Sequence, residues 1–247
     1  MKKIFTYTLI AFSFFCCTKN DQGNNIYVTA GTGGSLARFA IVGNYLYSVD
    51  DTRLRVFDIS NPSTPIYKNI VNIGWGIETI FAFKDKLFIG STSMVYIYSL
   101  ANPLNPTIIS TATSQQVFRR CDPVVAKDSV AYATLRSSSM CGGGRSVLSV
   151  IDIRFINNPI EIYTLPMQEP MGLGYWGNNL YVCDTSKGLQ VYDITNQYLP
   201  TLVKTLKDEK CLDVIPYDDE LICYTNTGIN IYDITNRSNP VKITTIK

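Results

Sequence analysis

The strongest constraint on the fold is a short phrase that occurs five times along the chain. It consists of an apolar residue, usually Asp, another apolar residue, and a proline seven positions after the Asp. The central residues are Asp58, Ser99, Asp152, Asp193 and Asp233, and the prolines are Pro65, Pro106, Pro159, Pro200 and Pro240. A period of about forty residues indicates that one supersecondary unit has been copied, as in repeat architectures.

Each unit contains short β-type runs separated by turn signals. In the first unit the runs are Leu36–Val42, Tyr45–Asp50, Leu54–Ile59 and Ile66–Val71, and Gly43-Asn44 is a typical hairpin turn. Four such runs, repeated in five units, predict an all-β fold, namely a five-bladed β-propeller in which each unit is one blade. The expected blades cover about residues 36–74, 75–116, 117–169, 170–209 and 210–247.

The third unit differs from the others. Its runs Val130–Leu135 and Val147–Ile153 are clear, but the segment between them, from Arg136 to Ser146, is about ten residues longer than in the other copies. Insertions in repeat proteins map to loops, often on the binding face.

The repeated Asp and Pro residues are interpreted as structural. Asp lies near the end of the third run, where its side chain can cap a turn by accepting hydrogen bonds from nearby backbone N–H groups. Proline cannot donate to a β-ladder, so a proline before the fourth run suits an outer edge strand. We therefore expect turn caps rather than catalytic groups at these positions: Asp58, Asp152, Asp193 and Asp233.

The runs LRVFDISNPSTP, LQVYDITNQYLP and INIYDITNRSNP, with GNYLYSVD and GNNLYVCD upstream, resemble the LVIVD repeat family. The resemblance covers about residues 36–247 and is looser in the second and third units. It implies a propeller fold, as in bacterial and archaeal surface proteins, and an extracytoplasmic location. It implies no established activity and no catalytic residues. Separately, Lys19-Asn20-Asp21 resembles the charged tract that follows the lipidated Cys in surface lipoproteins of the Bacteroidetes type.

The N-terminal segment reads as an export signal. Lys2 and Lys3 precede an apolar run, Ile4 to Phe15, that is too short to span a bilayer. The run ends at Cys16-Cys17 and a polar stretch follows, which resembles a bacterial lipoprotein signal. We expect residues 1–16 to be removed, Cys17 to be lipidated, and residues 17–35 to form a flexible tether to the outer membrane, on its periplasmic or cell-surface side.

Charge and composition exclude several classes of function. Without Lys2 and Lys3 the chain has 20 basic and 20 acidic residues, which argues against a nucleic-acid partner. The chain has no histidine, so Ser-His-Asp and Cys-His nucleophile systems and His-bearing zinc sites are impossible. We expect no metal and no cofactor.

The cysteines favour disulfides, because an exported protein enters an oxidising compartment. Two pairs are possible, Cys121 with Cys141 and Cys183 with Cys211, while Cys223 is expected to be a buried thiol. The alternative is that all five are reduced core residues. Their spacing fits no zinc or haem motif.

The candidate binding face carries the inserted loop. Its expected residues are Trp75, Glu78, Arg119, Arg120, Asp122, Arg145 and Asp213. A Trp between two glycines suggests an exposed aromatic for stacking on a sugar or filling a partner's pocket, unless it plugs the channel. The arginine pair could grip a carboxylate or phosphate, or form a solvated edge.

Two functions are weighed. The first is a non-catalytic cell-envelope lipoprotein whose propeller binds a protein or glycan. The alternative is a carboxylate-dependent enzyme acting on polysaccharide, with Glu78, Asp122 and Asp213 as the acidic groups. Glycoside hydrolysis needs two carboxylates about 5–10 Å apart. Converging carboxylates in an open pocket would favour the enzyme, and otherwise the binding module is favoured.

Overall fold

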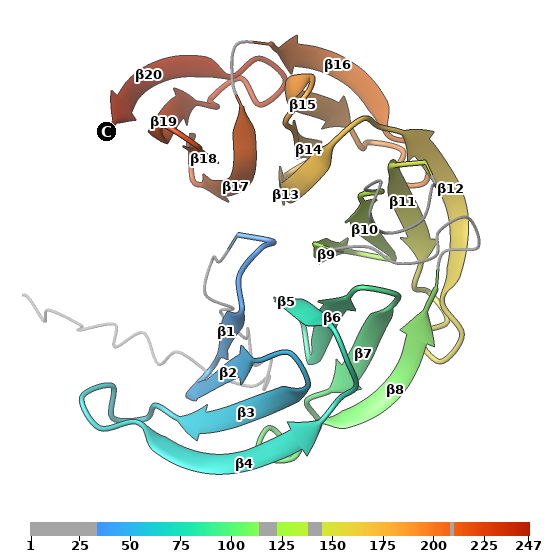
Figure 1. Ribbon diagram of the computed structural model, residues 1–247, viewed down its shortest axis with the longest axis vertical. Coiled ribbons are helices and arrows are strands. Elements are labelled where there is room, and N and C mark those ends of the chain that lie inside the picture. Colours follow the sequence, from blue (N-terminus) through green and yellow to red (C-terminus); the bar gives the residue numbers. More distant parts are fainter. Residues whose placement is uncertain (1–33, 114–122, 138–144, 208–209) are drawn as a thin grey trace, which may run out of the picture.

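The computed structural model of the protein describes residues 34–113, 123–137, 145–207 and 210–247. These residues form twenty strands, which assemble into five four-stranded sheets. Each sheet consists of four consecutive strands paired antiparallel. Figure 1 shows the sheets arranged around a central axis with one edge inward, so the prediction of a five-bladed β-propeller is confirmed.

The blades follow chain order, with the first strand of each nearest the axis and the fourth outermost (Figure 1). Blade 1 contains β1 (Phe39–Val42), β2 (Tyr45–Val49), β3 (Arg53–Asp58) and β4 (Ile66–Asn72). Blade 2 contains β5 (Ile77–Phe83), β6 (Lys86–Ser91), β7 (Val95–Ser99) and β8 (Thr107–Ala112). Blade 3 contains β9 (Val124–Lys127), β10 (Val130–Leu135), β11 (Val147–Asp152) and β12 (Ile160–Pro166). Blade 4 contains β13 (Pro170–Trp176), β14 (Asn179–Asp184), β15 (Gly188–Asp193) and β16 (Thr201–Leu206). Blade 5 contains β17 (Cys211–Tyr217), β18 (Glu220–Thr225), β19 (Gly228–Asp233) and β20 (Val241–Ile246).

The repeat extends to backbone detail. The turn between the first two strands begins with a residue of positive φ in every blade: Gly43 (57°), Lys84 (54°), Asp128 (51°), Gly177 (59°) and Asp218 (54°). Positive φ is easy for Gly and tolerated by Asp, so Lys84 shows that the hairpin geometry prevails over residue preference. Each of the five prolines directly precedes the outermost strand of its blade, where no ladder hydrogen bond is lost.

The core is divided among the seams between neighbouring blades. Four hydrophobic clusters are found in the described residues, and they join blades 1 and 2, 2 and 3, 3 and 4, and 4 and 5. The recurrent members are a Leu or Ala from the second strand and an aromatic or Ile from the third, such as Leu221 and Tyr232. Apolar burial of this kind, at about 25 cal/mol per Å², is the main force that holds one blade to the next.

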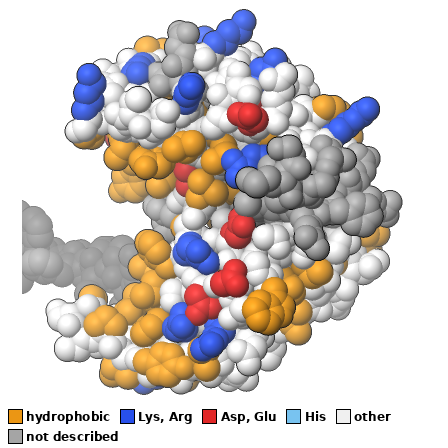
Figure 2. Space-filling view, viewed as in Figure 1, with side chains coloured by type: hydrophobic (Ala, Val, Ile, Leu, Met, Phe, Trp, Pro, Cys, Tyr) orange, Lys and Arg blue, Asp and Glu red, His pale blue; other side chains and the backbone are white. Residues whose placement is uncertain are grey.

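The ring is open. Figure 1 shows a gap between blade 5 and blade 1, and no hydrophobic cluster of the described residues joins these two blades. Figure 2 shows the same gap as a notch with hydrophobic side chains on both sides. Within the described part of the chain there is also no helix of the length and apolarity needed to cross a membrane.

Candidate functional site

The loops of the candidate face are tied together by backbone hydrogen bonds. The loops that link blades bond to the loops between second and third strands, as in Ile73 N to Thr52 O (3.0 Å) and Thr185 N to Glu169 O (3.0 Å). The turns between first and second and between third and fourth strands form the other face, as in Ile153 N to Ser129 O (2.9 Å). We call the first of these the Trp75 face.

Trp75 is the most exposed large hydrophobic residue of the described chain, at 80%. Its loop is nevertheless well fixed, because Ile73 N donates to Thr52 O and Thr92 N donates to Gly76 O (2.9 Å). The flanking glycines permit this close packing. A Cβ at Gly74 would lie 2.5 Å from the hydroxyl of Tyr96, and Gly76 has a φ of 65°. Trp75 therefore neither plugs the channel nor packs on its blade, and it is presented to solvent by an ordered loop.

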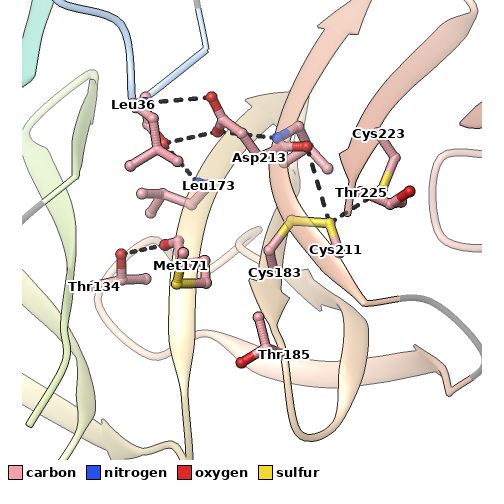
Figure 3. Close-up of a disulfide and its surroundings, with 12 residues drawn as sticks. Leu36, Thr134, Met171, Leu173, Cys183, Thr185, Cys211, Asp213, Cys223 and Thr225 are labelled. Atoms are coloured by element: carbon pink, nitrogen blue, oxygen red, sulfur yellow. Dashed lines mark hydrogen bonds between the residues drawn. A yellow bond between two sulfur atoms is a disulfide. The ribbon is translucent and has the colours of Figure 1, made fainter. Parts of the chain in front are cut away.

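Asp213 lies at the inner edge of blade 5, where the segment before β1 reaches it. Its Oδ1 accepts hydrogen bonds from Ser35 Oγ (3.2 Å) and Val214 N (3.0 Å), and its Oδ2 accepts from Leu36 N (3.3 Å). Ser35 Oγ in turn accepts from Leu173 N of β13 (2.7 Å). In Figure 3 a dashed line joins Leu36 to this carboxylate, and Leu173 lies close to both. The network links blades 1, 4 and 5 near the axis.

This network corrects two expectations from the sequence, namely where the flexible tether ends and where the first strand begins. Ser35 is 1% exposed, so the flexible tether does not extend to residue 35. The strand expected from Leu36 begins at Phe39, because the N–H of Leu36 donates to Asp213 rather than to a neighbouring strand. No signal in the sequence singled out Ser35, since a serine in a Gly-rich stretch is typical of a linker.

The carboxylate of Asp213 is enclosed by main chain. A Cβ at Gly34 would lie 2.1 Å from Oδ2, and a Cβ at Gly172 would lie 2.0 Å from Oδ1. Burial raises the pKa of Asp213 to about 6, against the opposing effect of the hydrogen bonds from Leu36, Val214 and Ser35. Such a pKa could suit a general acid. Both oxygens are, however, already occupied by donors of the chain itself.

The other residues of the expected site are placed as follows. Glu78 is half-buried in β5, and Arg145 is exposed at the end of the insertion. Arg119, Arg120 and Asp122 lie outside the described residues, as do Cys17, Cys121 and Cys141. Of the seven residues proposed for the face, the structure thus locates Trp75, Glu78, Arg145 and Asp213.

A group of charged side chains lies on the same face near blades 3 to 5. Thr185 Oγ1 donates to Glu169 Oε2 (2.6 Å), and this hydrogen bond, with contributions from Arg136 and Lys210, lowers the pKa of Glu169. Arg136 also contacts the sulfur of Met171 (Nη1 to Sδ, 2.8 Å). Glu169 lies between β12 and β13 and Lys210 between β16 and β17, so both belong to loops that link blades.

The described cysteines lie together at the seam between blades 4 and 5. Cys183 of β14 and Cys211 of β17 form a disulfide with a Cα–Cα distance of 5.0 Å. Cys223 of β18 is fully buried, with its sulfur 3.1 Å from that of Cys211 (Figure 3). All three sulfurs lie within 4.8 Å of one another, a spacing that could hold a soft metal ion if all three were thiolates. With Cys183 and Cys211 joined, one thiol remains, which is too few for such a site.

The repeated phrase residues make the same contact in every blade. Asp58, Asp193 and Asp233 each accept a hydrogen bond on Oδ1 from the backbone N–H two residues later, at 2.7–2.9 Å. Asp152 and Ser99 make the equivalent contacts with Arg154 N (2.9 Å) and Ala101 N (3.1 Å). Hydrogen bonding lowers the pKa of each of the four aspartates, which keeps them ionised as turn caps.

Comparison with known families supports the repeat. The LVIVD repeat matches residues 33–73 and 174–208, which correspond to blade 1 and most of blade 4. The resemblance seen in the sequence is confirmed. A search among curated proteins found no match.

Three solved structures illustrate the similarity of fold. A functionally unknown protein from Desulfotomaculum acetoxidans superposes with a TM-score of 0.64 at 12% identity, over 82% of this chain and 66% of that chain. A protein from Lactobacillus plantarum superposes with a TM-score of 0.64 at 14% identity, over 83% of this chain and 72% of that chain. The periplasmic gluconolactonase of Pseudomonas aeruginosa superposes with a TM-score of 0.60 at 12% identity, over 85% of this chain and 66% of that chain. This chain therefore spans about two thirds of the length of the first and third structures, and at such identity the likeness shows the fold alone.

Proposed function

Because the chain carries LVIVD repeats on a five-bladed propeller, we propose that it is a non-catalytic binding module of the cell envelope. In this proposal the Trp75 face takes a protein or glycan partner. The observation that carries it is the 80% exposure of Trp75 on a loop fixed by backbone hydrogen bonds. An ordered, exposed Trp offers a large contact area at little entropic cost, which is why Trp is enriched at binding hot spots.

The carboxylates favour binding over hydrolysis. A glycosidase of the ordinary kind needs one carboxylic acid and one carboxylate that both reach the scissile bond. Asp213 has the raised pKa that a general acid needs, but Ser35, Leu36 and Val214 occupy its oxygens. A substrate would have to displace the segment that links blade 1 to blades 4 and 5. We therefore assign Asp213 a structural role in this proposal.

Binding is tested with the full chain as bait, against cell-envelope polysaccharide in one arm and solubilised envelope proteins in the other. Trp75→Ala is compared with Phe155→Ala, because Phe155 is similarly exposed (77%) but belongs to a turn on the opposite face. We expect Trp75→Ala to lose the bound glycan or protein and Phe155→Ala to retain it. Equal retention by both variants would contradict the choice of face.

The membrane anchor is a separate part of the proposal. Export and lipidation at Cys17 rest on the sequence of residues 1–21, which lies outside the described residues. Mass spectrometry of the mature N-terminus tests it. We expect a diacylated or triacylated peptide that begins at Cys17. A mature peptide that runs unmodified from Phe15 through Cys17 would rule out the lipoprotein.

A further inference from the structure

The gap between blades 5 and 1 has two apolar walls. The blade 1 wall is a row across all four strands, formed by successive cross-strand partners: Ile41, Leu46, Phe57 and Tyr67. Phe57 and Tyr67 contact each other edge to face with ring centroids 5.7 Å apart. Phe39, two residues before Ile41 on β1, extends the wall along this strand and is 55% exposed. The positive charge of Arg55, which lies beside this wall on β3, is neutralised by an ion pair with Asp50 (2.7 Å).

The blade 5 wall is built in the same way. One row joins Ile215, Ile222 and Ile231 as cross-strand partners, and a second row beside it joins Tyr224 to Ile229. Tyr224 is 54% exposed, and the three isoleucines are half-buried. Soluble proteins rarely expose contiguous apolar surfaces of this kind without a partner. Figure 2 shows the two walls facing the notch from either side.

Comparison with the other blades shows that the blade 1 wall lacks a preceding blade to cover it. Leu46 and Phe57 occupy positions that are buried against the preceding blade everywhere else. The equivalents of Leu46, all at most 1% exposed, are Leu87, Ala131, Leu180 and Leu221. The equivalents of Phe57, all at most 5% exposed, are Tyr98, Ile151, Tyr192 and Tyr232. The blade 1 wall is thus one half of a seam.

The blade 5 wall is the other half. The equivalents of Ile222, each 0% exposed against the following blade, are Tyr47, Phe88, Tyr132 and Tyr181. The equivalents of Ile231, each at most 1% exposed, are Val56, Ile97, Val150 and Val191. A surface of the blade 5 type is therefore complementary to a surface of the blade 1 type at four seams of the same molecule.

We propose that the two walls are one interface shared between two molecules, in which the blade 5 wall of one copy packs on the blade 1 wall of a second copy. A second copy is chosen as the occupant because each of its walls belongs to a type that this repeat already buries against the other. The contact is heterologous, so it extends head to tail into a closed ring or an open chain.

The interface is independent of the Trp75 face, and its failure would leave the proposed binding function untouched.

The test is sedimentation velocity of the full chain in a mild detergent over a wide range of concentrations. Leu46→Glu places a charge in the blade 1 wall and Ile222→Glu places one in the blade 5 wall. Both side chains are only partly buried, so both variants should fold. We expect each to weaken self-association about a hundredfold or more, because an unpaired charge would be buried. Val203→Glu, on an exposed outer strand, is the matched control.

Mixing the two variants decides the geometry. A head-to-tail contact predicts a dimer in the mixture, since Leu46→Glu retains an intact blade 5 wall and Ile222→Glu an intact blade 1 wall. A wild-type chain that stays monomeric at every concentration, or a mixture that stays monomeric while the wild type associates, would overturn the proposal. Leu46→Ser and Ile222→Ser replace the glutamate variants if circular dichroism shows that either glutamate variant is unfolded.

Discussion

The seam between blades 4 and 5 and the gap between blades 5 and 1 are made of the same repeat positions with opposite outcomes. At the seam, Leu221 and Tyr232 are at most 1% exposed and a disulfide joins the two blades. At the gap, the equivalent Leu46 and Phe57 are only half-buried. The same residue type therefore stabilises the fold only where a neighbouring blade covers it. Where no blade covers it, it offers a surface for association.

The largest expected effect comes from truncating the same position on both sides of the comparison. Leu221→Ala should lower the free energy of unfolding by about 2–5 kcal/mol, because it opens a cavity in the seam. Leu46→Ala should cost less than about 1 kcal/mol in dilute solution, since its side chain loses little packing. Urea unfolding at low protein concentration measures both. Equal losses would mean that the gap is closed in solution.

The next effect concerns the covalent link across the seam. Cys183→Ser removes the disulfide, whose cysteines are 28 residues apart, and should lower the free energy of unfolding by about 3 kcal/mol under oxidising conditions. Under reducing conditions the variant and the wild type should differ much less. Peptide mapping with differential alkylation shows which cysteines are paired. A wild type with both Cys183 and Cys211 alkylated without reduction would contradict the link.

A smaller effect comes from the polar link across the gap between Asp213 and the segment of Ser35 and Leu36. The pKa of Asp213 is raised to about 6, so the folded state holds a proton that the unfolded chain releases near pH 4. The stabilisation from this carboxyl is therefore complete below about pH 4 and is lost as the pH rises through about 6.

Melting temperatures of the wild type and Asp213→Asn measured from pH 4 to 7.5 check this link. The difference between wild type and variant should move in favour of the wild type as the pH falls. Subtracting the melting temperature of the variant from that of the wild type removes the contribution of the turn-capping aspartates, which both proteins share. The lowered pKa values of these aspartates make the folded state less stable as the pH falls. A difference that is independent of pH would show that Asp213 titrates as an ordinary exposed carboxyl.

The smallest effect is a hydrogen bond at the seams. Tyr181 donates from its hydroxyl to Arg237 O (2.9 Å), and Tyr47 and Tyr132 make equivalent bonds to the following blade. Tyr181→Phe should cost about 1 kcal/mol in the free energy of unfolding. Ile222, which occupies this position at the gap, has no hydroxyl to lose, so Ile222→Val should cost no more than about 1 kcal/mol. A larger loss at Ile222 would indicate that the blade 5 wall is covered.

Much of the fold was predictable because the same pattern of strands and turns occurs five times in the sequence. The strands observed begin and end within a few residues of those expected, and the phrase residue caps a turn in every blade, as Ser99 in blade 2 and as Asp in the other four. The candidate site was less predictable. Trp75 was identified from its two glycines, but its exposure depends on contacts with Thr52 and Thr92 from other turns. Ser35 was missed because its partners lie far away in sequence, at Leu173 and Asp213.

The sequence by itself determined the period, the four strands of each blade and the turns between them, because these depend on residues a few positions apart. Only the tertiary structure decided which copies of a repeated side chain are covered. Leu46 and Leu221 are equivalent in the repeat, but burial depends on the blade that stands beside each one. A local pattern carries no information about a missing neighbour, and the open ring exposes on blades 1 and 5 the surfaces that the other seams bury.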